Sequence, residues 1–113
     1  MDVGIVGALQ FAIDGVTAQQ DATANNLANS ETPGFTASKV SFQSSLSAAL
    51  NTPGTQTAEV TSARSAATPA TNGNNVQLAS ELNDSEQETL QFSAISEAIN
   101  DQFRLVSGVA GGT

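Results

Sequence analysis

The side chains of this sequence that could do chemistry are carboxylates and hydroxyls. Acidic residues stand close together at Glu81 and Asp84, and again at Glu86 and Glu88. Paired carboxylates can act as a general acid and base, or can hold a divalent cation. Because no further ligand cluster surrounds them, we interpret these residues as the solvated face of a helix.

Serine and threonine are abundant, but nothing in the sequence would activate them as nucleophiles. The chain contains no His, Cys, Trp or Tyr, which removes imidazole bases, thiolates and Cys/His metal sites. A Gly-x-Ser-x-Gly elbow, a phosphate-binding loop and a dinucleotide fingerprint are also absent from the sequence. We therefore expect no enzyme, no cofactor and no metal centre.

The charge balance narrows the range of partners. Eleven acidic residues against three basic ones give a formal net charge of −8, which disfavours nucleic acid and anionic lipid surfaces. The first nine residues lack a basic segment, and their apolar run is short and glycine-rich. We expect neither a cleaved signal peptide nor a membrane span.

The elements that must position any functional residue begin with a helix over residues 1–29. Its apolar residues follow one another at steps of three, four and three, which is the spacing of an amphipathic helix with a coiled-coil-like seam: Val6, Leu9, Ile13 and Val16. A second stripe is made of small residues and would let a neighbouring helix approach closely: Gly4, Ala8, Ala12 and Gly15.

Residues 30–54 are predicted to form a turn and a short helix. Pro33 and Gly34 stand where a type II turn favours them. Phe42, Leu46 and Leu50 are four residues apart and predict a short helix, with Val40 as a backward extension. Residues 55–75 are rich in Thr, Ala, Ser and Asn, so we expect a flexible segment or a weak strand pair, with a strand around 57–61.

A second long helix is predicted over residues 76–109, followed by a glycine-rich tail at 110–113. Its apolar seam consists of Leu78, Leu82, Phe92, Ile95, Ile99, Phe103 and Val106. Such a helix would be roughly 45–50 Å long, whereas a compact domain of this length has a radius of gyration near ~13 Å. The expected fold is all-α, with the two terminal helices forming an elongated, coiled-coil-like hairpin whose remaining apolar surface is covered by other subunits.

One segment closely resembles the N-terminal signature of flagellar rod and hook proteins. In that signature, an Asn-Asn-aliphatic-Ala-Asn run leads into Thr-Pro-Gly-aromatic. The matching residues here are Asn25, Asn26, Leu27, Ala28, Asn29, Thr32, Pro33, Gly34 and Phe35. Residues 73–82, 90–95 and 103–106 are similar to the C-terminal part of the proximal rod protein B subfamily, with protein C of the proximal rod as the alternative.

The resemblance implies a structural subunit of the bacterial flagellar basal-body rod, which carries torque from the membrane rotor to the distal rod and hook. It also implies partners: copies of the chain, other rod proteins, membrane-ring, export-gate and rod-adaptor proteins, and the flagellar type III export apparatus. The asparagines are expected to fix the turn and contact adjacent subunits, whereas Phe35 fits either a local core or a neighbouring subunit. The alternative function is a small secreted helical-hairpin effector or adaptor.

Overall fold

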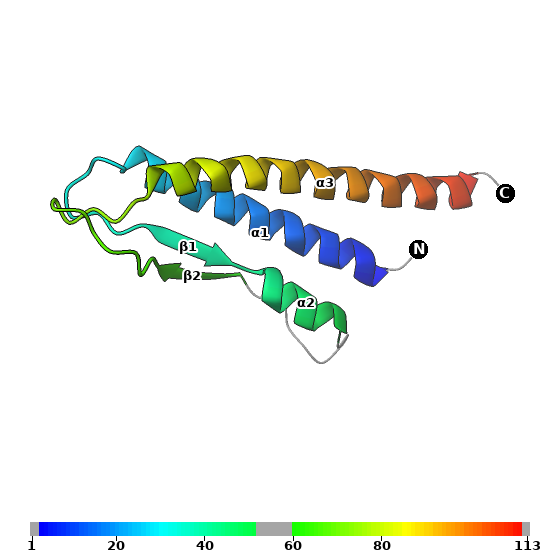
Figure 1. Ribbon diagram of the computed structural model, residues 1–113. Helices are drawn as coiled ribbons and strands as arrows, with labels where there is room; N and C mark the ends of the chain where they lie inside the picture. The colour runs from blue at the N-terminus through cyan, green and yellow to red at the C-terminus, as the bar shows by residue number, and fades with distance from the viewer. Residues whose placement is uncertain (1–2, 52–59, 112–113) are drawn as a thin grey trace.

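Two long helices make up most of the molecule (Figure 1). The computed structural model describes residues 3–51 and 60–111, which contain α1 (Val3–Ala28), β1 (Ser38–Ser41), α2 (Gln43–Asn51), β2 (Thr61–Arg64) and α3 (Leu78–Gly111). Helix α1 packs along α3 in the opposite direction. The molecule measures 66 × 28 × 14 Å, with a radius of gyration of 17.7 Å. The two long helices and the elongated shape are confirmed, while the coiled-coil hairpin stays a prediction.

A two-stranded antiparallel sheet lies beside α1. Strand β1 contacts α1 on one side and pairs with β2 on the other, with Ser38 opposite Arg64 and Ser41 opposite Thr61. The prediction that the short helix extends back to Val40 is therefore wrong, because Val40 is held in β1. Of the strand expected around 57–61, residues 57–59 lie outside the described residues, and β2 begins at Thr61.

The apolar core is small and centres on Phe42, immediately before α2. Phe42 packs with Ala12 and Val16 of α1, and its ring meets Phe11 edge to face with the ring centroids 5.9 Å apart. A Cβ atom on Gly15 would lie 2.4 Å from a Phe42 ring carbon. The expected stripe of small residues thus admits an aromatic ring at Gly15, because only glycine leaves room for it.

Helix α3 does not turn its apolar residues uniformly toward α1. Leu78, Leu82, Phe92 and Phe103 are exposed, whereas Ile95 packs against the core. Glu81 and Glu88 are buried instead, with exposed fractions of 4% and 8%. The interpretation of these two glutamates as part of a solvated face is therefore wrong, because α1 presents hydrogen-bond donors to both of them.

Candidate functional site

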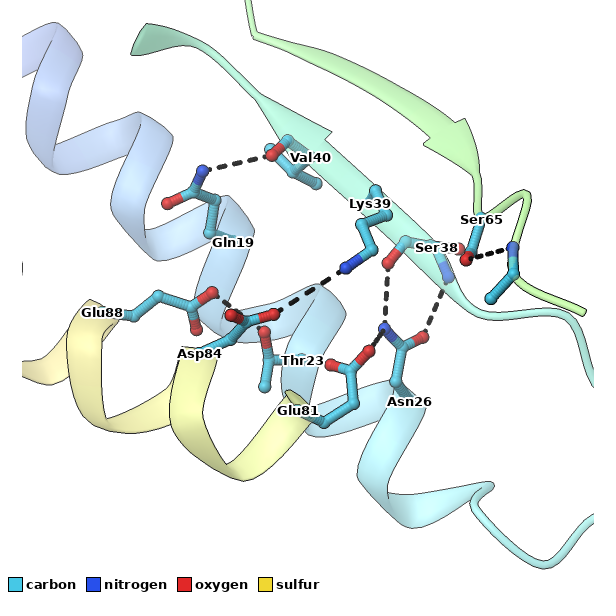
Figure 2. A network of polar contacts seen from close by, with 11 residues as sticks. Gln19, Thr23, Asn26, Ser38, Lys39, Val40, Ser65, Glu81, Asp84 and Glu88 are labelled. Atoms are coloured by element: carbon cyan, nitrogen blue, oxygen red, sulfur yellow. Dashed lines mark hydrogen bonds and ion pairs between the residues drawn. The ribbon is translucent and has the colours of Figure 1, made fainter. Parts of the chain in front are cut away.

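Asn26 is the residue of the signature that joins the most elements. Its side chain is 1% exposed, and it pairs with Ser38 in both directions: Asn26 Nδ2 donates to Ser38 O, and Ser38 N donates to Asn26 Oδ1, each at 2.9 Å (Figure 2). The same Nδ2 donates to Glu81 Oε1 at 3.2 Å. One amide side chain therefore closes the free edge of β1 and ties α1 to the first turn of α3.

Gln19 binds the same edge of β1, two residues further along the strand. Its Nε2 atom donates to Val40 O at 3.1 Å. In an antiparallel pair, alternate residues direct their backbone groups away from the partner strand. Asn26 binds both outward backbone groups of Ser38 and Gln19 binds the carbonyl of Val40, so these side chains cover this edge against pairing with another strand.

Asn29 fixes the turn that follows α1. Its Nδ2 donates to Asn25 O at 2.9 Å, and its Oδ1 accepts from Thr32 Oγ1 at 3.2 Å. Phe35 N then donates to Thr32 O at 3.2 Å, and Gly34 has a positive φ of 76°. These features confirm the predicted type II turn, in which only the third residue needs a positive φ.

Two further asparagines, Asn74 and Asn75, lie shortly before α3 and bind this turn from the other side. Asn74 Nδ2 donates to Asn29 O and to Thr32 O, each at 2.8 Å. Asn75 Oδ1 accepts from Ala37 N at 2.7 Å, and both asparagines are buried. The turn after α1 and the segment before α3 are thus braced together by side-chain amides.

A polar cluster continues from Asn26 along the contact between α1 and α3 (Figure 2). Thr23 Oγ1 donates to Glu88 Oε2 at 3.0 Å. Lys39 Nζ, on β1, lies 3.8 Å from Asp84 Oδ2. This ion pair is partly exposed and contributes at most about 1 kcal/mol.

Burial sets the electrostatics of Glu88. Loss of solvation raises the pKa of Glu88 above its ordinary value, the hydrogen bond from Thr23 lowers it, and the negative charges of Asp84 and Glu81 raise it further. Lys39 lowers the pKa slightly. Burial and two neighbouring carboxylates therefore outweigh the one hydroxyl donor and the one cation.

The structure brings only part of the sequence-predicted site together. Asn26, Asn29, Thr32 and Gly34 belong to the braced turn. Of the rest, Leu27 and Phe35 are half-buried, whereas Asn25, Ala28 and Pro33 are exposed.

The predicted helix seam is only partly buried within the chain. Val16 is buried, and the side chain of Val106 lies outside those described. The half-buried members of the seam are Val6, Leu9, Ile13, Ile95 and Ile99. Contact of these residues with adjacent subunits stays a prediction.

Sequence reasoning assigned no role to Thr23, Asn74 or Asn75, and it placed Glu81 and Glu88 in solvent. Two adjacent asparagines after a glycine and before a helix were an available signal, because asparagine side chains bind nearby backbone groups. The pairings of Asn26 with Glu81 and of Thr23 with Glu88 span 55 and 65 residues. No local pattern in the sequence indicates such pairings.

The described residues contain no group of three or more His, Cys, Asp or Glu side chains placed to hold a metal ion. Nor is any helix within 3–51 and 60–111 long and apolar enough to cross a membrane.

Comparison with known proteins concerns the segment that contains α1 and the turn after it. Residues 9–36 match the family model described as "Flagella basal body rod protein", which covers about a quarter of the chain. No curated protein matches the chain significantly. The match spans most of α1 and the braced turn, including Thr23, Asn26 and Asn29. It supports the flagellar basal-body rod family, which is structural and non-enzymatic, and it does not favour the secreted adaptor.

Proposed function

We propose that this chain is a structural subunit of the proximal part of the bacterial flagellar rod, transmitting torque from the membrane rotor to the distal rod and hook. The observation that carries the proposal is the segment from Asn25 to Phe35. It lies wholly within the family match, and its Asn26 and Asn29 side chains hold α1, β1 and the turn in place. A signature whose side chains stabilise the fold of the subunit itself fits a structural role.

An exposed apolar stripe supports packing among subunits. Its members lie along one side of α3 and have exposed fractions between 37% and 54%: Leu78, Leu82, Phe92 and Phe103. Complete burial of such a side chain stabilises a structure by about 1.5–3 kcal/mol. We propose that copies of the chain and other rod proteins cover this stripe, so that the same contact repeats along the assembly.

Torque transmission requires that each subunit resist shear between its own helices. The hydrogen bonds of Asn26 to Ser38 and to Glu81 connect α1, β1 and α3 without relying on the small apolar core. Interdigitated side chains between subunits would resist sliding in the same way, because packed interiors have low compressibility.

We further propose export through the flagellar type III apparatus without a cleaved signal, and assembly in the periplasm against membrane-ring, export-gate and adaptor proteins. Helix α1 contains Gly4, Gly7 and Gly15, each of which costs about 1 kcal/mol of helix stability relative to alanine. A helix that is weak until its neighbours pack on it suits a chain that folds only after export.

The test uses two adjacent residues that are both exposed in the single chain, Phe92 and Ser93. A strain lacking the gene should be non-motile and should regain motility with the wild-type gene. Phe92→Asp should then lower the amount of rod recovered with basal bodies, while Ser93→Asp, which adds the same charge, should not. Since neither residue is buried within the chain, the difference would report contact with another subunit. Equal, near-normal motility of both variants would refute the proposed packing.

A further inference from the structure

A polar cavity of about 160 Å³ lies between α1, β1 and α3. Its lining includes Gln19 and Thr23 of α1, Lys39 of β1, and Glu88 and Gln91 of α3. The cavity is far larger than the roughly 10–15 Å³ that one water molecule needs. It can therefore admit a side chain as well as solvent.

One oxygen of Glu88 has no partner in this cavity. The residue is 8% exposed, and while Oε2 accepts from Thr23, Oε1 is buried without a hydrogen bond to any described residue. A buried carboxylate oxygen without a donor is costly. Three carboxylates line the cavity, those of Glu81, Asp84 and Glu88, against the single ammonium group of Lys39. The cavity therefore carries more negative than positive charge, and Glu88 Oε1 has no donor among the described residues.

Among the residues that the structure describes, the chain itself contains one basic side chain that is free to bind such a cavity, that of Arg64. Of its three basic residues, Lys39 is paired with Asp84 and Arg104 with Asp101. Arg64 forms no ion pair with any described residue, is exposed, and belongs to β2, whose four residues are all exposed. Strand β2 lies on the side of β1 away from α1, and Arg64 is not among the residues that line the cavity.

We infer that the cavity is a binding site for a guanidinium group, and that its occupant is Arg64 of a second copy of this chain. A guanidinium group presents several N–H donors in a planar fork. It can donate to Glu88 Oε1 and at the same time to the side-chain carbonyl of Gln91 or Gln19. This charge-assisted pairing would satisfy the buried oxygen and offset the excess negative charge.

The contact has a direction, because β2 of one copy and the cavity of the next are different surfaces. Such a heterologous contact repeats from copy to copy and builds a ring or a helical array. The assignment to a second copy rests on the proposed function, in which copies pack together. The affinity of the cavity for guanidinium does not rest on it.

The first experiment tests the cavity with N-acetylarginine amide as the probe. The side-chain carboxyl signal of Glu88 is followed by carbon NMR as the probe is added to the purified chain, with potassium chloride at equal ionic strength as the comparison. We expect a saturable shift that potassium does not produce. The shift should disappear in Glu88→Gln, followed at the side-chain amide, and persist in Glu86→Gln, which removes one charge from an exposed position of the same helix.

Glu88→Gln is a conservative probe, because the amide oxygen can still accept from Thr23 while the amide nitrogen cannot accept from a guanidinium. Circular dichroism should show that the variant keeps the helix content of the wild type. Absence of a saturable shift in the wild type, or the same shift with potassium, would mean that the cavity holds only water or any small cation. Either result would overturn the inference.

The second experiment tests the occupant by sedimentation velocity. Arg64→Gln and Glu88→Gln should each weaken self-association about tenfold, which corresponds to about 1.4 kcal/mol. The double variant should be no weaker than either single variant, since both remove the same contact. Arg104→Gln, an equal change of charge at an exposed residue, should leave self-association unchanged.

A wild-type chain that stays monomeric, or an Arg64→Gln variant that associates normally, would overturn the assignment to a second copy. Neither result would bear on the rod proposal, which the motility of the Phe92→Asp strain tests separately.

Discussion

Replacing Asn26 by alanine is the change that most directly tests how the signature holds the fold together. The substitution removes two hydrogen bonds of 2.9 Å to Ser38 and one of 3.2 Å to Glu81. Ser38 is half-buried and Glu81 is buried, so water cannot fully replace these bonds. At about 1 kcal/mol for each partner left without its bond, the loss is about 3 kcal/mol.

A loss of this size is large for a small chain, whose free energy of unfolding is expected to lie near the low end of about 5–15 kcal/mol. It would raise the unfolded population about a hundredfold. The assay is urea unfolding followed by far-ultraviolet circular dichroism, with hydrogen exchange of the Ser38 amide as a local measurement. The Ser38 amide should exchange faster in Asn26→Ala even where the helix signal is unchanged.

Asn25→Ala is the matched control, because Asn25 is the preceding residue, is exposed, and within the described part of the chain its side chain makes only a 3.4 Å contact, through its oxygen. Its free energy of unfolding should stay within about 0.5 kcal/mol of the wild type. If Asn25→Ala and Asn26→Ala unfold at the same urea concentration and Ser38 exchanges equally in both, the reasoning about the Asn26 clamp is refuted.

Three further predictions concern the core, the buried carboxylate and the helix face. Gly15→Ala should lower the free energy of unfolding by about 1–3 kcal/mol, because the new methyl group would overlap a phenyl ring. Gly7→Ala, whose added atom would have no described neighbour within 4 Å, should instead raise the free energy of unfolding by up to about 1 kcal/mol. Urea midpoints that do not move in these opposite directions would refute the core packing. Since the pKa of Glu88 is raised in the fold, the folded chain binds this proton more tightly than the unfolded chain, so stability should fall as pH rises above the ordinary glutamate value and level off above the raised value. Glu88→Gln should remove that part of the pH dependence, and an unchanged profile would contradict the burial of this carboxylate. Ile99→Asp should lower the amount of rod recovered with basal bodies, because the half-buried side chain becomes a carboxylate without a partner, whereas exposed Glu97→Gln should not; equal recovery would mean that this face of the helix contacts nothing.

The features that could be predicted from the sequence are those that local patterns encode. The apolar spacing of α1 and α3 predicts their helices, and Pro33 with Gly34 predicts the turn that the positive φ of Gly34 confirms. The step of four from Phe42 to Leu46 predicts α2. Each of these signals lies within a few residues of the structure that it specifies.

The features that could not be predicted depend on distant partners. Strand β1 has no strong strand sequence, and it exists because β2 pairs with one edge while Asn26 and Gln19 bind the other. The inward position of Glu81 and Glu88 likewise depends on donors from α1. A glutamate on an amphipathic helix normally faces water, so the pattern within α3 alone favours the wrong face.

The exposed stripe of α3 and the Asn26 clamp both bear on one proposal, that this chain is a structural subunit of the flagellar rod. The most direct measurement is electron microscopy of isolated basal bodies from a strain whose only copy of the chain carries a short epitope tag after Gly54, with motility confirmed for the tagged strain and antibody-bound gold as the label. We predict gold along the proximal part of the rod, between the membrane rotor and the distal rod, and none in basal bodies from the untagged strain. Intact rods without gold, or gold only outside the rod, would contradict the claim.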